Sequence, residues 1–466
     1  MVKTVPPLSF ISQATALLSY TGRACIHHQR ILYCTAATSS DTEPLQELES
    51  NGNNDEQCIA NVSPVSRQRK VSLSLPTVFL PHKLQTALEK ALQGYSRKVL
   101  AADGQALSEF LLSRKVSTKQ DRDKTKASEP PSSMNPWEND KGAKKSRSFH
   151  LHFKYGRRET VAYAASRLPA VYGTTLRALT EIARGDNSFR PETLLDFGSG
   201  LGASVWAAHS LWAESLYEYQ CVDVSSDMGN LARVLRVGGE IPLQEPHPPT
   251  PEDIPGVHFR QYLPLSNKVG YDIVVGGHSL GEVHSLKLRR MFLASLWRKT
   301  RKYLVLVEPG NWTGFKVISE ARDMILQAAS KWTRYEDESS EELEGHVFAP
   351  CPHESECPLI LNSKLPCRFG QRVQLALSER NGPLKHKGYH LENFSYVVLK
   401  KGPRNHDEGV DGRILQPTKK RTKHILCKLC TRQGEVKDVI LTKSKHRDVY
   451  RECRESKWGD TLTGLS

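Results

Sequence analysis

Hydrophobic residues recur at two different periods along this chain, and the period changes near residue 193. Over residues 80–111, and again over 163–182, apolar side chains return every three or four positions, as on one face of an amphipathic helix. After residue 193, short apolar runs alternate with helical stretches. Strands and helices in alternation predict an α/β fold with a doubly wound, Rossmann-like parallel sheet, preceded by a helical region.

The predicted elements of the sheet region are short. They are strands at 193–197, 217–225, 271–277 and 302–310, with helices at 203–213, 228–237 and 286–297. Further apolar runs predict strands at 396–399, 424–429 and 436–442. A small C-terminal β extension is therefore expected to follow the main sheet.

The charge balance narrows the choice of partner. The 466 residues include 65 Lys and Arg against 51 Asp and Glu, and the net charge of +14 favours a polyanion such as RNA. No run of about 18 apolar residues occurs, so a membrane span is not expected. Ten cysteines are too few for a disulfide scaffold in a chain of this length.

The first 40 residues have the composition of a targeting peptide. They contain no Asp or Glu and are rich in Ser, Thr and Ala, as in an organelle transit peptide. A mitochondrial destination is predicted, with a plastid as the second choice and an untargeted disordered tail as the plain alternative.

A glycine-rich turn follows the first predicted strand. The sequence from Asp196 to Gly202 reads DFGSGLG, which fits the acid-x-Gly-x-Gly-x-Gly loop of class I S-adenosylmethionine-dependent methyltransferases. Asp223 ends the next strand, where a carboxylate can accept both hydroxyls of a ribose, and Met228 is placed to pack on an adenine. The expected cofactor-binding residues are Asp196, Gly198, Gly200, Gly202, Asp223 and Met228.

Binding of a methyl donor does not establish methyl transfer. The Asn/Asp-Pro-Pro-aromatic turn used for amino methylation is replaced by VGGHSLGE at 275–282, and no cysteine lies between Cys221 and Cys351 to attack a cytosine. His278 and Glu282 have the chemistry to serve as acid or base, but they are interpreted as a capping histidine and a helix-start acid. The sequence therefore predicts no catalytic residue and an inactive methyltransferase fold, with an active enzyme as the alternative.

Thiols gather in the C-terminal third. Cys351, Cys357 and Cys367 lie in a polar, Pro-rich segment with gaps of five and nine residues, which suit a 4Fe-4S cluster better than zinc knuckles. The fourth ligand is predicted to be Cys430, at the end of a strand, with Cys427 as the alternative. A zinc-stapled RNA-binding protein and inert buried cysteines are the competing interpretations. His353 is expected at the surface.

A basic stretch follows these strands. Lys and Arg residues over 443–454, with Tyr450 and Trp458 among or near them, suit phosphate contacts and base stacking. An ordinary solvated helix face is the alternative.

Five segments together resemble one known family. They are DFGSGLG (196–202), YDIVVGGHSLGEV (271–283), LVEPG (306–310), CPHESECPL (351–359) and RESKWGD (454–460). They resemble the mitochondrial small-ribosomal-subunit assembly factors called the methyltransferase-like protein seventeen family, which has fungal and bacterial relatives. The resemblance implies a monomeric matrix protein that binds the small subunit and its rRNA, not DNA or membrane, with methyl transfer lost and a C-terminal iron-sulfur cluster.

The chain is accordingly predicted to have five regions. They are a transit peptide (1–42), a disordered linker (43–78), a helical region (79–190) with a basic mobile loop (114–147), a methyltransferase-like domain (191–345) and a cysteine-rich, metal-binding, basic β extension (346–466).

Overall fold

The computed structural model describes most of the chain after residue 71. The described residues are 72–114, 153–239, 254–264, 266, 269–283, 285–332, 344–404 and 411–463. The predicted transit peptide, most of the predicted linker and nearly all of the loop at 114–147 lie outside these residues. Within them, no helix has the length and apolar character needed to cross a membrane.

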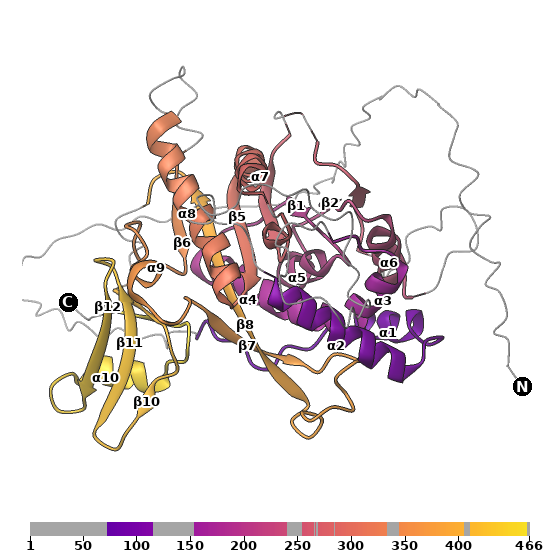
Figure 1. Cartoon of the computed structure of the whole chain (residues 1–466). Helices are drawn as coiled ribbons and strands as arrows, with labels where there is room; N and C mark the ends of the chain where they lie inside the picture. Colours follow the sequence, from indigo (N-terminus) through magenta and orange to yellow (C-terminus); the bar gives the residue numbers. More distant parts are fainter. Residues whose placement is uncertain are drawn as a thin grey trace, which may run out of the picture. The chain divides into compact units, whose positions relative to one another are not determined.

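An eight-stranded sheet runs through the described part of the chain (Figure 1). Its strands, in sheet order, are β3 (Val257–Arg260), β2 (Glu218–Val222), β1 (Thr193–Phe197), β4 (Tyr271–Gly277), β5 (Thr300–Pro309), β8 (Tyr389–Lys401) and β6 (Gly345–Ala349), and β7 (Phe369–Gln374) pairs with β8. Strands β1 to β5 are parallel, while β8 is antiparallel to β5, β6 and β7. The α/β fold with a class I methyltransferase sheet is confirmed.

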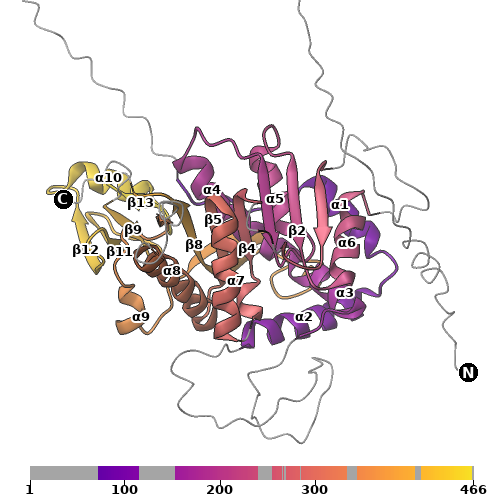
Figure 2. The same ribbon diagram turned by 90° about the horizontal axis from the view of Figure 1, so that it is seen from above.

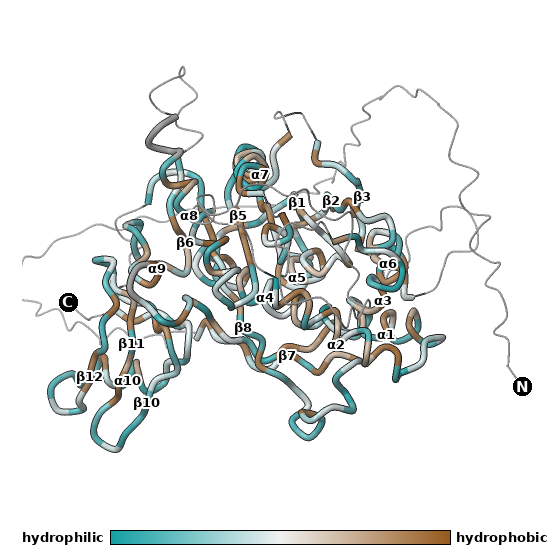
Figure 3. Tube along the Cα trace, viewed as in Figure 1, coloured by the Kyte–Doolittle hydropathy of each residue, from teal (hydrophilic) through white to brown (hydrophobic). Residues whose placement is uncertain are grey.

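Helices cover both faces of this sheet (Figure 2). One face packs against α1 (His82–Ala91), α4 (Leu168–Gly185), α5 (Ala203–Trp212) and α6 (Ser226–Arg236), and the other against α7 (Leu286–Lys299) and α8 (Trp312–Trp332). Neighbouring strand residues divide between the two cores: Val305 faces the first and Leu304 the second. Burial on both faces explains why the central strands are continuous apolar runs (Figure 3).

The helical region differs from its prediction at residue 167. Instead of one helix over 163–182, the chain forms α3 (Arg157–Ser166), which ends there, and then α4. Helix α2 (Arg97–Ser113) packs on α3. Pro169 has no N–H to donate to the Ala165 carbonyl, which instead accepts from the Ser378 N–H at 3.0 Å. Proline therefore breaks a continuous apolar period into two helices.

The main sheet includes strands from both sides of residue 345, where the methyltransferase-like domain was predicted to end. Strands β6, β7 and β8 come from the region assigned to the β extension, and β8 is buried on both faces like the parallel strands. At the other end, Val78 exchanges backbone hydrogen bonds with the residues around Val373 in β7. Residues on both sides of the predicted boundaries thus contribute to one folded unit.

A second, five-stranded sheet forms the C-terminal part. It contains β9 (Gly412–Ile414), β10 (Lys419–Lys420), β11 (His424–Thr431), β12 (Val436–Thr442) and β13 (Thr461–Leu462). Helix α10 (Arg447–Glu455) covers its apolar face through Tyr450 and Cys453. The predicted strands at 424–429 and 436–442 are confirmed as the antiparallel pair β11 and β12.

Candidate functional site

The glycine-rich loop joins β1 to α5 at the carboxyl edge of the sheet. Gly198, Gly200 and Gly202 have φ angles of 69°, 49° and 77°, in the left-handed region that favours glycine. A Cβ at Gly198 would also lie 2.4 Å from the Cβ of Ser279. The N–H groups of Gly198 and Ser199 donate to the Val222 carbonyl at 2.8 and 3.0 Å, so the end of β2 fixes the loop.

Asp196 carries the least satisfied charge at this edge. Its side chain is fully buried, and neither carboxylate oxygen has a partner with hydrogen-bond geometry among the described residues, although the Ser204 hydroxyl is close enough to lower its pKa somewhat. Burial raises the pKa of Asp196 to about 7. A buried acid without a partner is what a ligand with an ammonium or hydroxyl group would satisfy.

Asp223 is already engaged by the backbone. Its two carboxylate oxygens accept from the N–H groups of Gly200 at 2.7 Å and Ser225 at 2.9 Å. Burial nevertheless raises the pKa of Asp223 above its ordinary value. Each oxygen retains a lone pair for a ribose hydroxyl. Met228, in the first turn of α6, is buried in the core.

A segment before α3 crosses the same edge. The Tyr155 carbonyl accepts from the Ser225 hydroxyl at 2.8 Å, and the Tyr155 hydroxyl donates to Glu282 at 2.5 Å. Phe153 and Tyr163 pack edge-on against the Tyr155 ring. This aromatic strap joins the end of β2 to the loop after β4.

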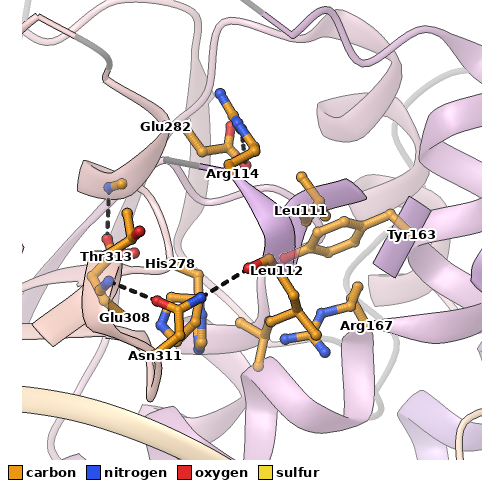
Figure 4. A pocket seen from close by; sticks show the side chains of 14 residues that line it. Leu111, Leu112, Arg114, Tyr163, Arg167, His278, Glu282, Glu308, Asn311 and Thr313 are labelled. Carbon is orange, nitrogen blue, oxygen red and sulfur yellow. Dashed lines mark hydrogen bonds and ion pairs between the residues drawn. The ribbon is translucent and has the colours of Figure 1, made fainter. Parts of the chain in front are cut away.

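A cavity of about 50 Å³ lies beside the strap, at the carboxyl ends of β4 and β5 (Figure 4). Leu112, Arg114, Tyr163, His278, Glu282 and Glu308 are among the side chains that line it. Its lining includes none of the six predicted cofactor residues. Pockets that bury a drug-sized ligand are several times larger, so this cavity does not admit a nucleoside as it stands.

The end of α2 closes this cavity. The Asn311 side-chain amide donates to the Leu112 carbonyl at 2.9 Å, and Arg114 lies 3.8 Å from the Glu282 carboxylate (Figure 4). Both contacts bring the last turn of α2 onto the loops that follow β4 and β5. The place where a methyl acceptor would approach the sheet edge is thus covered by the protein's own chain.

Two of the ionisable side chains around the cavity, Glu308 and His278, are largely uncharged near neutral pH. Burial raises the pKa of Glu308 to about 8 and lowers that of His278 to about 3. His278, interpreted from sequence as a cap, instead places its ring Nε2 3.1 Å from the Thr174 hydroxyl. Sequence reasoning missed Glu308, although an acid at the end of a buried strand was a visible signal.

The four thiols predicted to ligate the cluster lie within electrostatic range of one another. Burial raises the pKa of Cys367, and negative charge on Cys357, Cys351 or Cys430 would raise it further. Burial likewise raises the pKa of Cys357 to about 11, with Cys351 as the next cause. Within the described ranges, no three His, Cys, Asp or Glu side chains are arranged to hold a single metal ion. The structure therefore brings the four thiols into mutual range without the spacing of a one-metal site.

Two residues near these four thiols, Cys427 and His353, have different surroundings. Cys427 faces α10, where its hydrogen bond with Cys453 is the largest cause that raises its pKa. His353, predicted at the surface, is 5% exposed, and its Nε2 lies 3.3 Å from the sulfur of Cys430. The prediction for His353 was wrong because a β11–β12 turn, distant in sequence, covers it.

The basic stretch over 443–454 is exposed, but its aromatic partners are not free to stack. Arg447, Arg451 and Arg454 lie on the exposed side of α10, whereas Tyr450 is 4% exposed and belongs to the core of the small sheet. Trp458 packs against the main core beside Gly370. The expected base stacking by Tyr450 is therefore wrong, since the same helix period that exposes the arginines buries this ring.

Comparison with known proteins identifies the family of this chain. The family described as mitochondrial small ribosomal subunit Rsm22 matches residues 157–463. Human METTL17, named as a mitochondrial ribosome assembly protein, is 36% identical over 414 residues, which cover 86% of each chain. The chain belongs to the Rsm22 family.

Other members and folds are more distant. The mitochondrial ribosome assembly protein RSM22 of Saccharomyces cerevisiae is 21% identical over 425 residues, covering 65% of this chain and 66% of its own. A solved methyltransferase from Aquifex aeolicus, described as SAM-dependent, aligns with 53% of this chain and 100% of its own, at 12% identity and a TM-score of 0.29. A TM-score this low adds nothing to what the strand order already shows about the fold.

Proposed function

We propose that this Rsm22-family protein is an assembly factor of the mitochondrial small ribosomal subunit that acts in the matrix and binds rRNA. The observation that carries the proposal is the 36% identity to human METTL17 over 86% of both chains. The family match at residues 157–463 includes the sheet and the cysteine region. The net charge of +14 supports an RNA partner. The exposed arginines of α10 are the contact surface we assign to it.

Methyl transfer is not part of this proposal. The cavity at the β4 and β5 ends is small, α2 closes it, and the groups around it include a neutral His278 and a Glu308 that is largely protonated at neutral pH. His278 is a weak base and Glu308 is largely protonated, so neither is well suited to accept a proton from an amino group. The alternative, an active rRNA methyltransferase, draws its support from the glycine-rich loop and from the unpartnered Asp196.

S-adenosylmethionine is the ligand we propose for that edge. Asp196 would hold its ammonium, Asp223 its ribose, and Gly198, Gly200 and Gly202 would allow close backbone approach, with Met228 beside the adenine. Bound there, the cofactor would supply an activated methyl group. The closed cavity favours a structural use of the ligand, in which binding orders the sheet edge for docking on the subunit.

A 4Fe-4S cluster is the group we propose for Cys351, Cys357, Cys367 and Cys430. Their chemistry fits: all four are free cysteines from two separate segments, each within electrostatic range of others in the set. A cluster is larger than a single ion, and its thiolates stand further apart than those around zinc. When bound, it would cross-link the Pro-rich loop to β11 and so fasten the small sheet to the main one.

Sedimentation and a methylation map of small-subunit rRNA test the functional proposal together. Wild-type protein should co-sediment with immature small subunits from mitochondrial lysate, and its deletion should deplete those particles without removing any rRNA methyl group. Assembly restored by Asp196→Asn would support an assembly role without methyl transfer, and would count against the ordering role proposed for S-adenosylmethionine. A methyl group that disappears on deletion and returns only with intact Asp196 would instead establish the enzyme.

Metal analysis tests the cluster separately. Protein purified without oxygen should be brown and contain about four irons and four sulfides per chain. Colourless protein with one zinc per chain would replace the cluster by a structural zinc site and leave the assembly role standing.

A further inference from the structure

The histidine beside the thiol cluster has a defined position at both ring nitrogens. His353 Nδ1 lies 2.8 Å from the Ser355 hydroxyl, and His353 Nε2 lies 3.3 Å from the Cys430 sulfur. The side chain of His353 is almost fully buried. Ser355, His353 and Cys430 therefore form a chain of polar contacts that ends on one of the four thiols.

The charge of a metal-bound thiolate determines which atom is the donor in each of these two contacts. A thiolate carries no proton and can only accept a hydrogen bond, so the Nε2 atom must be the donor. A neutral imidazole then has an unprotonated Nδ1, which accepts from the Ser355 hydroxyl. The serine thus selects the ring tautomer that presents an N–H to sulfur, as hydrogen-bond partners commonly do for histidines at metal sites.

The backbone around His353 is held by a buried arginine. Arg322 on α8 donates through Nη2 to the carbonyls of His353 at 3.0 Å and Ser355 at 2.9 Å, and it pairs with Asp323 at 2.7 Å. Its side chain is 4% exposed. Arg322 also lies within electrostatic range of Cys351, Cys357 and Cys430.

The turn between β11 and β12 covers the same pair. Gly434, with φ at 79°, lies so close that a Cβ there would be 2.1 Å from the Ser355 hydroxyl oxygen and 3.4 Å from His353 Nδ1. The hairpin that carries Cys430 therefore also encloses the histidine. His353 and Cys430 are both almost fully buried, so solvent has little access to their contact, whereas Ser355 itself is exposed.

We propose that His353 is a positioning residue for the cluster, which donates Nε2–H to the Cys430 sulfur and thereby raises the cluster's reduction potential. The inference rests on the 4Fe-4S cluster of the proposed function. A hydrogen bond to a ligating sulfur stabilises the more negative, reduced cluster over the oxidised one. Arg322 adds buried positive charge and keeps the histidine backbone in place, so both residues favour the reduced state.

Potentiometric titration of the cluster in the full-length protein, followed by electron paramagnetic resonance, measures this effect. The variants are His353→Phe, which removes the donor; His353→Gln, whose amide N–H can replace Nε2–H; and Ser355→Ala, which frees the tautomer. His346→Phe is the matched control, because His346 is another buried histidine whose Nδ1 contacts a backbone carbonyl, that of Gly402.

His353→Phe should lower the equilibrium constant for one-electron reduction about tenfold, which corresponds to about 59 mV. Ser355→Ala should lower it less, and His353→Gln and His346→Phe should stay near wild type. An unchanged potential in His353→Phe, with full iron content, would overturn the inference and leave the cluster in place. If His353→Phe cannot be loaded with iron, Ser355→Ala decides alone: a lowered potential supports the inference, and a wild-type potential overturns it. Wild-type protein without iron would instead refute the cluster itself.

Discussion

The Arg413 guanidinium on β9 donates to both carboxylate oxygens of Glu181 on α4, at 3.0 and 3.3 Å. Arg177 on α4 shares the same carboxylate at 2.8 Å, and the Tyr396 hydroxyl donates to it at 2.6 Å. Burial alone would raise the pKa of Glu181, but the two arginines outweigh it and lower the pKa to about 2. One buried acid therefore joins the small C-terminal sheet to the main domain.

Removal of Glu181 should loosen that connection. Glu181→Ala leaves two buried arginines without a carboxylate, and we expect a loss of about 3–5 kcal/mol in the free energy of unfolding. Urea unfolding followed by fluorescence measures it, and limited proteolysis should cut near residue 411 first. Asp438→Ala is the control, since its ion pair with Lys428 is largely exposed and should change stability by no more than about 1 kcal/mol. Equal effects of the two substitutions would contradict this role for Glu181.

Stability should fall as pH rises from 6.5 to 9. Burial would lower the pKa of His390, but its contacts with Glu379 at 3.0 Å and Glu392 at 3.3 Å raise it to about 9. A histidine whose folded pKa exceeds its unfolded value stabilises the protein fully below about pH 6.5, and this contribution disappears as pH passes through 9. The change is about 3 kcal/mol. Thermal unfolding across this range measures it, and His390→Gln should flatten the curve; a parallel curve would rule out His390 as the source.

Asp196 should lower the stability of the ligand-free protein and contribute to ligand binding. Its buried, unpartnered carboxylate is destabilising when ionised, so Asp196→Asn should stabilise the ligand-free protein at pH 8 by about 1 kcal/mol or more. The same change should remove most affinity for S-adenosylmethionine, a loss of roughly 1.5–3 kcal/mol. Differential scanning calorimetry and titration calorimetry give the two values. A stabilised variant that still binds would show that Asp196 does not contact the ligand.

Two cysteines three residues apart should behave differently. Cys430→Ser should remove iron from the protein, whereas Cys427→Ser, which changes a thiol facing Cys453, should retain it. The absorbance of the brown chromophore and iron analysis per chain distinguish them. Full colour in Cys430→Ser with loss in Cys427→Ser would reverse the ligand assignment.

The arginines of α10 should contribute salt-dependent RNA affinity. Alanine at Arg447, Arg451 and Arg454 should weaken binding to small-subunit rRNA and reduce the slope of log K against log salt by about 0.7–0.9 for each phosphate that is no longer neutralised. Filter binding at several salt concentrations measures the slope. Lys287, Arg290 and Arg298 on α7 serve as a matched exposed triple. An equal loss of affinity from both triples would mean that net charge, not α10, guides the RNA.

Local pattern was sufficient for four of the five parallel strands, and only β3 (Val257–Arg260) was missed among them. The strand at Thr193–Phe197 has the predicted bounds, because an apolar run followed by a glycine-rich turn has few other solutions. The antiparallel strands were harder: only part of β8 was predicted, and β6 and β7 were not. Strand β8 pairs with β5 and β6, which are distant from it in sequence, so no local period specifies which edge β8 joins. Strand β7 was missed although its partner β8 is the next strand along the chain.

The site shows the same division. The loop glycines could be found from sequence because their φ requirement is local. Arg114 and Tyr155 could not, since their role depends on α2 and the strap meeting the sheet edge. His353 was misplaced for the same reason: its burial comes from a turn about 80 residues downstream in a hairpin that its own sequence context does not indicate.

The sheet order also constrains how this chain can complete its fold. Strand β5 ends at Pro309, yet its outer neighbour is β8, which begins at Tyr389, and β6 has only β8 as its partner in the described sheet. A chain that emerges from a membrane pore N-terminus first would expose the β5 edge until residue 401 has passed. Unpaired edges invite association with other chains. The cysteine segment, which lies between β6 and β8, thus enters its compartment while the sheet is still open, and a factor that shields strand edges would be needed until β8 docks.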